Sequence, residues 1–571
     1  MALNRERLQS ADLVLTCPQP SMRSAAEHTV RSFRPSAMTA GSVGVNATLT
    51  DANINATCVG LLVAPDDGAA RGLFARIMSV ASTTATLDRP LPSVTNVTSV
   101  SAWKDPTISV RVTTADGSAP FDVISTDHSS AVVGTSEPDG YWATGEYLMV
   151  GVAGANAGRA ALITGFTAAT GTFVVAANTF VAISVGELFE IWQLVKLEAD
   201  VDASVDQKVL ERSFMGTGRI AADVPVPITV DGHVSLEMGA KMITTAGASG
   251  VAATRPMNVS GMLESCFTRH SDTGGTVVSA NATIINSGSS ALTQGGFVLL
   301  NTGEVVQVLA TDDGGAVGVI DVAAYTAGAL THGSVTNGSV MYASTWYEPK
   351  TVDFRNQAFA LYRGGYHMQR LFGCLPAVTL TIDRENIVRW KLAFTAGESI
   401  SYPLVRPVAL GATAPLILPD NTIPTDPKWS RCLIDGVQHN VANIAVDFGF
   451  SPQVRKSLRG MNEADGAWMQ KRPDTKMTFQ IIADDDETAG NVAMVDRIPR
   501  RTNVQFLYQK GRAAKETFAI GVPALFITKA EFGYDGGLGV YNCEATCVDP
   551  VAAGYAAATY ANLPPISVGW L

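Results

Sequence analysis

The chain has 571 residues, so several domains are expected, because a single hydrophobic core stops growing at roughly 250–300 residues. Hydrophobic residues make up 46% of the sequence, which excludes global disorder, while charged residues make up only 16%. A chain so poor in charge is expected to hide much of its surface against partners. The formal net charge of −11 disfavours a protein that grips nucleic acid, since such binding depends on Lys and Arg.

The beginning of the sequence, Met1–Ser10, carries charged residues and no apolar run, so we expect no signal peptide. No stretch of about 18 apolar residues occurs further along, and we expect no membrane anchor. The seven cysteines are odd in number and widely spaced, which argues against a disulfide scaffold. Cys543 and Cys547 are predicted to lie on one face of a strand, about 13 Å apart and too far to bridge.

Three stretches share a pattern in which a Gly stands five residues before a β-branched residue and a second short strand follows. They are Gly72–Ile77, Gly158–Ile163 and Gly303–Val308. A strand, a small polar turn and a second strand are typical of a β-hairpin. We predict that the three stretches are degenerate copies of one β unit, the alternative being unrelated hairpins of similar composition.

These units are expected to be inserted in a host domain, whose segments have larger side chains, more Arg and Lys, and longer alternating runs. The predicted modules span 36–103, 104–196 (with the repeated unit at 128–196) and 277–346. The predicted host parts, followed by a C-terminal extension, span 1–35, 197–276, 347–550 and 551–571.

The host is predicted to consist mostly of strands. Apolar and polar residues alternate along 378–383 and 388–395, on either side of a turn at 384–386, which predicts a long hairpin with one apolar and one polar face. The same alternation predicts strands at 442–450, 477–481 and 504–508.

Two short helices are expected. One spans Val259–Phe267, with Met262, Leu263 and Cys266 on one face. The other runs from Asp484 to Ile498, because acidic residues favour a helix N-terminus and Pro499 ends the helix.

A search for catalytic and ligand-binding patterns finds no phosphate-binding loop, no His or Cys pair with metal-ligand spacing, and no nucleophile elbow. The acidic run Asp484–Glu487 lacks the alternating spacing of a calcium loop, and Asp435 with His439 is expected to be a solvated pair in a turn. We therefore predict that the chain is not an enzyme, with no catalytic, cofactor-binding or metal-binding residues and no cofactor.

Three host segments carry a recognisable order of motifs, at 226–267, 346–397 and 432–477. In the first, the strand Val234–Gly239 leads to a Pro and then to Met262–Phe267. In the second, a Gly-turned hairpin precedes Gly373-Cys374 and a strand that ends in Phe394-Thr395-Ala396-Gly397. This order resembles the tail-tube (major tail) proteins of long-tailed bacteriophages, although Phe267 stands where that family often has Gly. The resemblance covers the host parts, roughly half the chain.

The resemblance implies a mainly β fold: a tail-tube-like β-sandwich or barrel core with one or two short helices, carrying three small inserted β modules. Subunits of that family form hexameric rings and lend strands to a continuous inner sheet, and the rings stack into the tail tube. The implied role is viral genome ejection, with DNA passing through the lumen without specific binding. The implied partners are the chain itself and the tape-measure, tail-terminator and distal tail proteins. The implied location is the virion tail, after synthesis in the host cytoplasm.

Two alternatives stay open at this stage. The chain could be another β-rich virion protein, such as a distal tail, decoration or spike protein. It could also bind carbohydrate through its modules, which would require exposed aromatic platforms. Aromatic residues are sparse in the modules, where only Tyr141 and Trp142 are adjacent.

Overall fold

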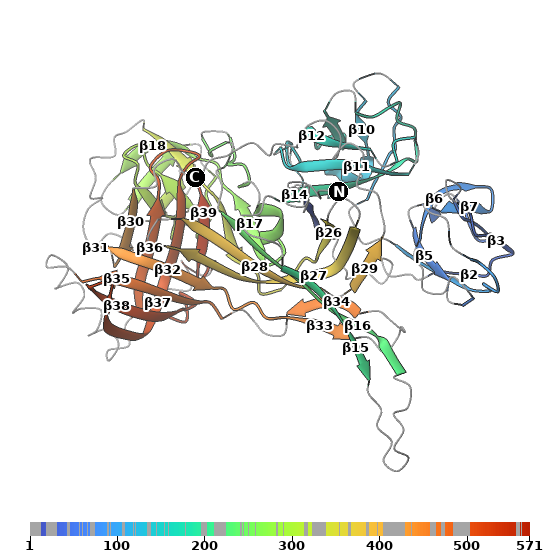
Figure 1. Cartoon of the computed structure of the whole chain (residues 1–571). Coiled ribbons are helices and arrows are strands. Elements are labelled where there is room, and N and C mark those ends of the chain that lie inside the picture. The colour runs from blue at the N-terminus through green and yellow to red at the C-terminus, as the bar shows by residue number, and fades with distance from the viewer. Residues whose placement is uncertain are drawn as a thin grey trace, which may run out of the picture.

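The computed structural model describes residues 13–18, 31–195, 202–210, 224–321, 339–402, 429–456, 464–469, 474–483 and 503–571, apart from short gaps within these ranges. Within them the fold is mainly β, as predicted, and all strand pairs are antiparallel (Figure 1). The described α-helices are short, α2 (Ser130–Val133) and α3 (Ser260–Leu263). The expected helix at 259–267 is thus shorter than predicted, because Phe267 already begins a strand. The helix expected at 484–498 lies outside the described residues.

Among the described residues, each module contains six strands. The first has β2 (Arg31–Phe33) continued by β3 (Ala37–Thr39), β4 (Thr48–Thr50), β5 (Leu61–Pro65), β6 (Ala75–Ala81), β7 (Thr84–Leu87) and β8 (Val100–Lys104). The second has β9 (Ser109–Arg111), β10 (Val123–Ile124), β11 (Tyr147–Ala153), β12 (Ala160–Thr167), β13 (Thr172–Val175) and β14 (Leu188–Val195). The third has β18 (Gly275–Ala280), β19 (Ile284–Gly288), β20 (Phe297–Leu299), β21 (Val305–Gln307) continued by β22 (Ala310–Asp312), β23 (Gly318–Asp321) and β24 (Val340–Ala343).

The three modules share one strand order. With the strands of each module numbered one to six along the chain, hydrogen-bonded neighbours follow the order 1-2-5-4-3-6, and strand six pairs back to strand one. The second module repeats these pairings, with the bridge between Thr114 and Ile124 joining its first two strands. The third repeats them as well. Each module is therefore a closed six-stranded sheet, which supports the interpretation that they are copies of one unit.

The repeated sequence pattern marks the place where the fourth strand of a module changes partner. Ile77, Ile163 and Val308 stand there, and each is fully buried. Before this point the strand pairs with strand three, and after it with strand five. In the third module, this change of partner divides the fourth strand into β21 and β22. The hairpin that was predicted to begin with Gly303–Val308 is therefore not formed by these residues, because β21 pairs with β20, and β22 pairs with β23.

The host core consists of two packed layers. One layer is an eight-stranded sheet whose neighbouring strands are β15 (Asp202–Leu210), β16 (Val224–Gly239), β28 (Val388–Ala396), β27 (His367–Ile382), β32 (Val441–Asp447), β35 (Lys476–Ile482), β38 (Leu538–Cys547) and β37 (Phe518–Asp535). The other contains β17 (Phe267–Ser271), β25 (Thr345–Pro349), β39 (Ser567–Trp570), the first half of β37, β36 (Asn503–Lys510), β30 (Ser430–Ile434) and β31 (Val437–His439). The layers meet where Trp390 stacks on Trp570, with ring centroids 6.1 Å apart.

A smaller group of strands connects the core to the second module. It contains β1 (Leu13–Pro18), β26 (Gln357–Arg363) and β29 (Glu398–Tyr402), with β1 lying between β14 and β26. A separate ribbon is formed by β33 (Pro452–Lys456) and β34 (Ala464–Met469). Figure 1 shows the first module standing apart at one end, and the hairpin of β15 and β16 projecting below the body.

The predicted long hairpin of the host is present. Leu380 of β27 pairs with Trp390 of β28, and both side chains are buried, while Thr381 and Lys391 are exposed. The alternating runs near 444, 479 and 506 are strands as predicted, and their apolar side chains join the same core. Cys543 and Cys547 lie on the buried face of β38 as unpaired thiols. The turn predicted at 384–386 lies outside the described residues.

Both ends of the chain depart from the expected division into parts. Arg31–Phe33, assigned to the tube core, pairs with β8 and belongs to the first module. Within the expected C-terminal extension, Ser567–Trp570 is a core strand between β25 and β37. A four-residue strand is too short to show a period in the sequence, although burial of Trp570 against Phe518 holds it firmly in place.

The second module is fastened to the core by a buried cationic contact. Arg255 donates to the carbonyl oxygen of Tyr141 (2.6 Å) and to Glu264 (3.2 Å), and its guanidinium lies 3.7 Å from the centre of the Tyr141 ring. Burial alone would raise the pKa of Glu264, but Arg255 and Arg269 lower it to about 2. The carboxylate therefore stays charged, and the contact keeps its ion pair.

The third module is joined to the core around a buried carboxyl group. Asp272 accepts hydrogen bonds from Thr293 Oγ1 (2.7 Å) and from Trp346 Nε1 (3.1 Å). Burial raises the pKa of Asp272 to about 6, against the lowering effect of these donors.

We expect this junction to be more stable in mild acid. A carboxyl group whose folded pKa exceeds its unfolded value of 3.8 favours folding at low pH, and this contribution is lost as pH rises through about 6. Lowering the pH from 7.5 to 5 should therefore stabilise the junction by on the order of 1 kcal/mol. Hydrogen exchange of residues 297–312 in wild type and Asp272→Asn at both pH values, corrected for the pH dependence of intrinsic exchange, tests this. If the variant is stabilised between pH 7.5 and pH 5 as much as wild type, other titratable groups cause the stabilisation.

Candidate assembly surface

The outer face of the eight-stranded sheet carries polar residues at alternate positions of four central strands. We call it the polar face, and its residues are Thr379, Thr381, Asp383, Asn443, Ala445, Asp447, Lys476, Thr478, Gln480, Asn542, Glu544 and Thr546. The residues between them, such as Ile444 and Phe479, are buried in the core. Because side chains of a strand alternate between its two sides, one sequence pattern supplies both the packed layer and the polar face.

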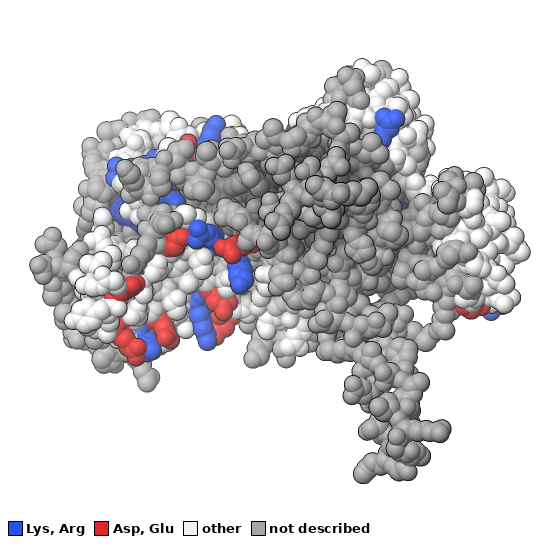
Figure 2. All heavy atoms as spheres, in the orientation of Figure 1, with Lys and Arg blue, Asp and Glu red and all other residues white. Residues whose placement is uncertain are grey.

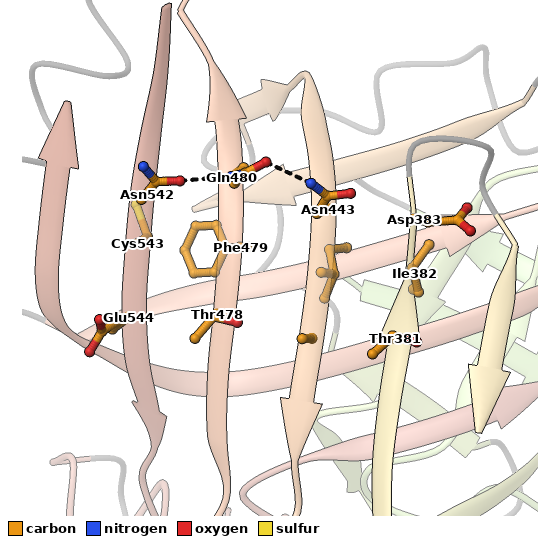
Figure 3. A pocket seen from close by; sticks show the side chains of 12 residues that line it. Thr381, Ile382, Asp383, Asn443, Thr478, Phe479, Gln480, Asn542, Cys543 and Glu544 are labelled. Atoms are coloured by element: carbon orange, nitrogen blue, oxygen red, sulfur yellow. Dashed lines mark hydrogen bonds between the residues drawn. The ribbon is translucent and has the colours of Figure 1, made fainter. Parts of the chain in front are cut away.

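Three amide side chains form a ladder across this face (Figure 3). Asn443 Nδ2 donates to Gln480 Oε1 over 2.6 Å, and Gln480 Nε2 donates to Asn542 Oδ1 over 2.8 Å. The three residues stand directly opposite one another on β32, β35 and β38. They cross a shallow depression lined also by Thr381, Thr478 and Glu544, among other residues. Amide side chains carry no charge, so the ladder presents hydrogen-bonding groups to a passing ligand but no ionic contact.

Charges of both signs are interspersed on the polar face and its borders. Arg389 lies 2.6 Å from Asp383 on one border, and Lys529 lies 3.1 Å from Glu531 and 3.6 Å from Glu544 on the other. Figure 2 shows acidic and basic side chains side by side over the described part of this region. Paired charges cancel at short range, so the described face presents neither a basic track for phosphates nor a strongly acidic field.

The eight-stranded sheet has open ends within the described residues. β15 pairs with β16 and with no other described strand. β37 pairs with β36 only up to Phe526, and beyond that residue β38 is its one described partner. Open edges expose unpaired backbone N–H and C=O groups, which attract further strands.

The residues weighed for chemistry at the sequence level do not form a site in the described structure. Asp435 accepts a hydrogen bond from the backbone N–H of Gln505, and His439 is buried. Burial lowers the pKa of His439. The described residues contain no group of three or more His, Cys, Asp or Glu side chains placed to hold a metal ion. The run Asp484–Glu487 lies outside the described residues.

The aromatic residues of the modules do not form an exposed platform in the described part of the chain. Tyr141, Trp142 and Trp192 are buried, and so is Trp346 beside the third module. Binding of sugar rings would need such a platform, so the carbohydrate-binding alternative gains no support from these residues.

None of the helices described is both long and apolar enough to span a membrane. In comparisons with known proteins, no family matches this chain, and no curated protein matches it either.

Sequence reasoning identified the polar side of the hairpin at 378–395 but missed the amide ladder. Asn443 and Gln480 are visible as polar residues within alternating runs, yet their alignment depends on which strands are neighbours. In the sequence, each residue occupies a polar position of its own alternating run. This position indicates on which face of the sheet the residue lies, but it does not indicate which strand lies beside it.

Proposed function

We propose that this chain is a structural subunit of a phage tail tube, which assembles into hexameric rings that stack around a conduit for DNA. The observation that carries the proposal is the eight-stranded sheet, which combines a polar, charge-balanced face with end strands that have no further partner among the described strands. Edges that would otherwise aggregate are satisfied when copies pair in a closed ring.

In this proposal the polar face lines the lumen. DNA carries a phosphate charge about every 1.7 Å of its length, so a lumen rich in unpaired Lys or Arg would retain it. A lining of amides, hydroxyls and paired charges lets DNA pass without specific binding. The apolar side of the same strands packs against the second layer and keeps the sheet rigid.

The three modules are accessory parts of the proposed subunit. The first lies at the end of the molecule away from β37 and β38 (Figure 1), and it contacts the second module through a buried ion pair between Arg76 and Glu190, 2.8 Å apart. The further partners of the tube, as the resemblance implies, would be tape-measure, tail-terminator and distal tail proteins. The proposed location is the virion tail.

Negative-stain electron microscopy of the purified full chain tests the proposal. We expect rings or tubes of uniform diameter with six-fold symmetry. A preparation that stays monomeric at every concentration tried, with no rings at low or high salt, would contradict it. Another virion β protein would give defined particles without a continuous hollow tube.

A further inference from the structure

The fourth strands of the three modules carry equivalent positions that face outward. Arg76, Leu162 and Gln307 each stand immediately before the buried residue at which that strand changes partner. In the first module, Ala75 and Ile77 belong to the interior cluster of the module. Successive side chains of a strand point to opposite sides, so Arg76 between them faces away from that interior, and so do its equivalents.

In the first module, this position contacts the second module. The guanidinium of Arg76 lies 2.8 Å from Glu190 of β14, and the two side chains are 8% and 3% exposed. Glu190 also accepts a hydrogen bond from Trp192 Nε1 over 2.8 Å. Beside the ion pair, Val59 of the first module packs against Val152 of the second. Buried charges are stable only while they remain paired, so this contact fixes the place where the first module docks.

The face of the second module that receives Arg76 contains the equivalent position of that module. Leu148 is directly opposite both Leu162 and Trp192. Directly opposite residues lie on the same side of a sheet, as do residues two apart in one strand. Leu162, Leu148, Trp192 and Glu190 therefore share one face, which is formed by the third, fourth and sixth strands of the second module.

The third module docks on the core with the same face. Gln307 is fully buried, and a Cβ atom added to Gly521 of β37 would lie 2.5 Å from its Oε1 atom. Phe297, directly opposite Gln307, would clash in the same way with a Cβ atom added to Gly569 of β39. Two glycines of the core thus leave the space that this face of the third module occupies.

We propose that the face formed by the third, fourth and sixth strands is the docking surface of each module, and that the side chain before the partner change determines what the module docks onto. The partner is another β-sheet of the same chain with a complementary residue. Arg76 requires a carboxylate, whereas Gln307 requires a strand with glycine. Leu162 supplies apolar area to the face that receives the first module. The inference concerns contacts within one chain and does not depend on the proposed function.

Two physical reasons favour side chains as the determinants of docking. The described strands of the first module pair only with one another, so strand addition does not hold this module in place. A wrong residue at the outward position would either leave a charge buried without its partner or overlap with the opposing backbone. Mismatches of this kind give specificity by excluding wrong surfaces.

The first test measures the distance between the first two modules of the full chain, with spin labels at Ala81 and Thr167, which are both exposed. Wild type should give one narrow distance distribution. Arg76→Glu and Leu162→Asp should each raise the fraction of molecules with a broad distribution at least about tenfold.

Matched variants separate release of the first module from other effects. Arg76→Glu combined with Glu190→Arg should restore the narrow distribution. Arg159→Glu makes the same charge change at an exposed residue outside the docking surface and should leave the distance unchanged. Hydrogen exchange of β12 should stay as in wild type for Leu162→Asp, which shows that the second module remains folded.

The second test concerns the third module. The backbone N–H of Val305 donates to Gln509 Oε1 of the core over 2.9 Å, so exchange of this amide reports on docking. Gly521→Ala should speed this exchange at least about tenfold, and Gln307→Ala added to it should restore slow exchange by removing the overlap. Gly117→Ala is the matched control, because a Cβ atom there meets no other atom within 4 Å.

Three results would overturn the inference. An unchanged distance in both Arg76→Glu and Leu162→Asp would show that another surface holds the first module. Release by Arg159→Glu as well would mean that the net charge, and not the docking surface, controls the contact. Slow exchange of Val305 in Gly521→Ala would show that Gln307 does not determine where the third module docks.

Discussion

Replacing Arg431 with Met is expected to loosen the third module from the core at a cost of about 3–5 kcal/mol. Arg431 of β30 and Glu304, which precedes β21, are 2.6 Å apart, and their side chains are 5% and 3% exposed. Removing the guanidinium leaves the Glu304 carboxylate buried beside an apolar side chain, and desolvation of that charge is then no longer offset.

Two further variants separate this effect from a general loss of packing. Arg431→Met combined with Glu304→Leu removes both charges and should recover most of the stability. Lys529→Met breaks an exposed pair, with side chains 46% and 63% exposed, and should cost less than about 1 kcal/mol.

The measurement must resolve one module, because a chain of several domains does not unfold in a single step. Hydrogen exchange of residues 297–312 reports on the third module, and exchange of β8 reports on the first. Faster exchange confined to 297–312 in the Arg431→Met variant is the expected result. Equal exchange in wild type and variant would show that the ion pair contributes nothing to holding the module.

The fold could be predicted from the sequence where a single strand carries its own signal. The run around Leu380 and Trp390 alternates strictly, so its hairpin and its buried side follow from the period of two. The modules were located because Ile77, Ile163 and Val308 are buried at the same point of a repeated unit, which requires a similar residue each time. A requirement that concerns one strand alone can be recognised in the sequence of that strand.

The arrangement of the strands could not be predicted in the same way. β37 pairs with β36, β38 and β39 along different parts of its length. Gly521 and Pro523 lie where the partners change, but neither residue identifies which strands are the partners. The amide ladder depends on β35 lying between β32 and β38, although more than fifty residues separate β35 from β38 in the sequence. Long-range pairing is set by packing of the whole core, and single-strand patterns are compatible with several neighbours.

The polar face illustrates both what single strands show and what only their arrangement shows. Sequence alternation indicated that a polar face exists, whereas the structure places Asp447 and Glu544 on it together with the amide ladder. Both acids are exposed. Asp447 is opposite Lys476, and Glu544 is 3.6 Å from Lys529, so each acid balances a nearby base. The balance of charge on the face can therefore be changed at defined positions.

Reversing both acids, by Asp447→Lys and Glu544→Lys, is expected to turn the polar face into a surface that retains DNA. The double variant removes two negative charges and adds two positive ones, so the net charge rises by four per copy, and Lys476 and Lys529 lose these acidic neighbours. In the proposed six-membered ring the change would be multiplied sixfold, and it would be repeated at every ring of the proposed tube. Because each neutralised phosphate steepens the salt dependence of binding, retention should be strong at about 50 mM salt and weak at about 200 mM.

The experiment compares two matched single variants. It measures how much duplex DNA their assembled tubes retain, and how fast DNA passes through reconstituted particles. Glu544→Lys and Asp127→Lys change the charge equally, but Asp127 is an exposed residue of the second module and lies off the polar face. Slower passage with Glu544→Lys and unchanged passage with Asp127→Lys would locate the conduit at the polar face. Equal behaviour of the two, with normal tubes in both, would mean that the conduit is lined by another surface, because charge that DNA does not meet cannot slow it.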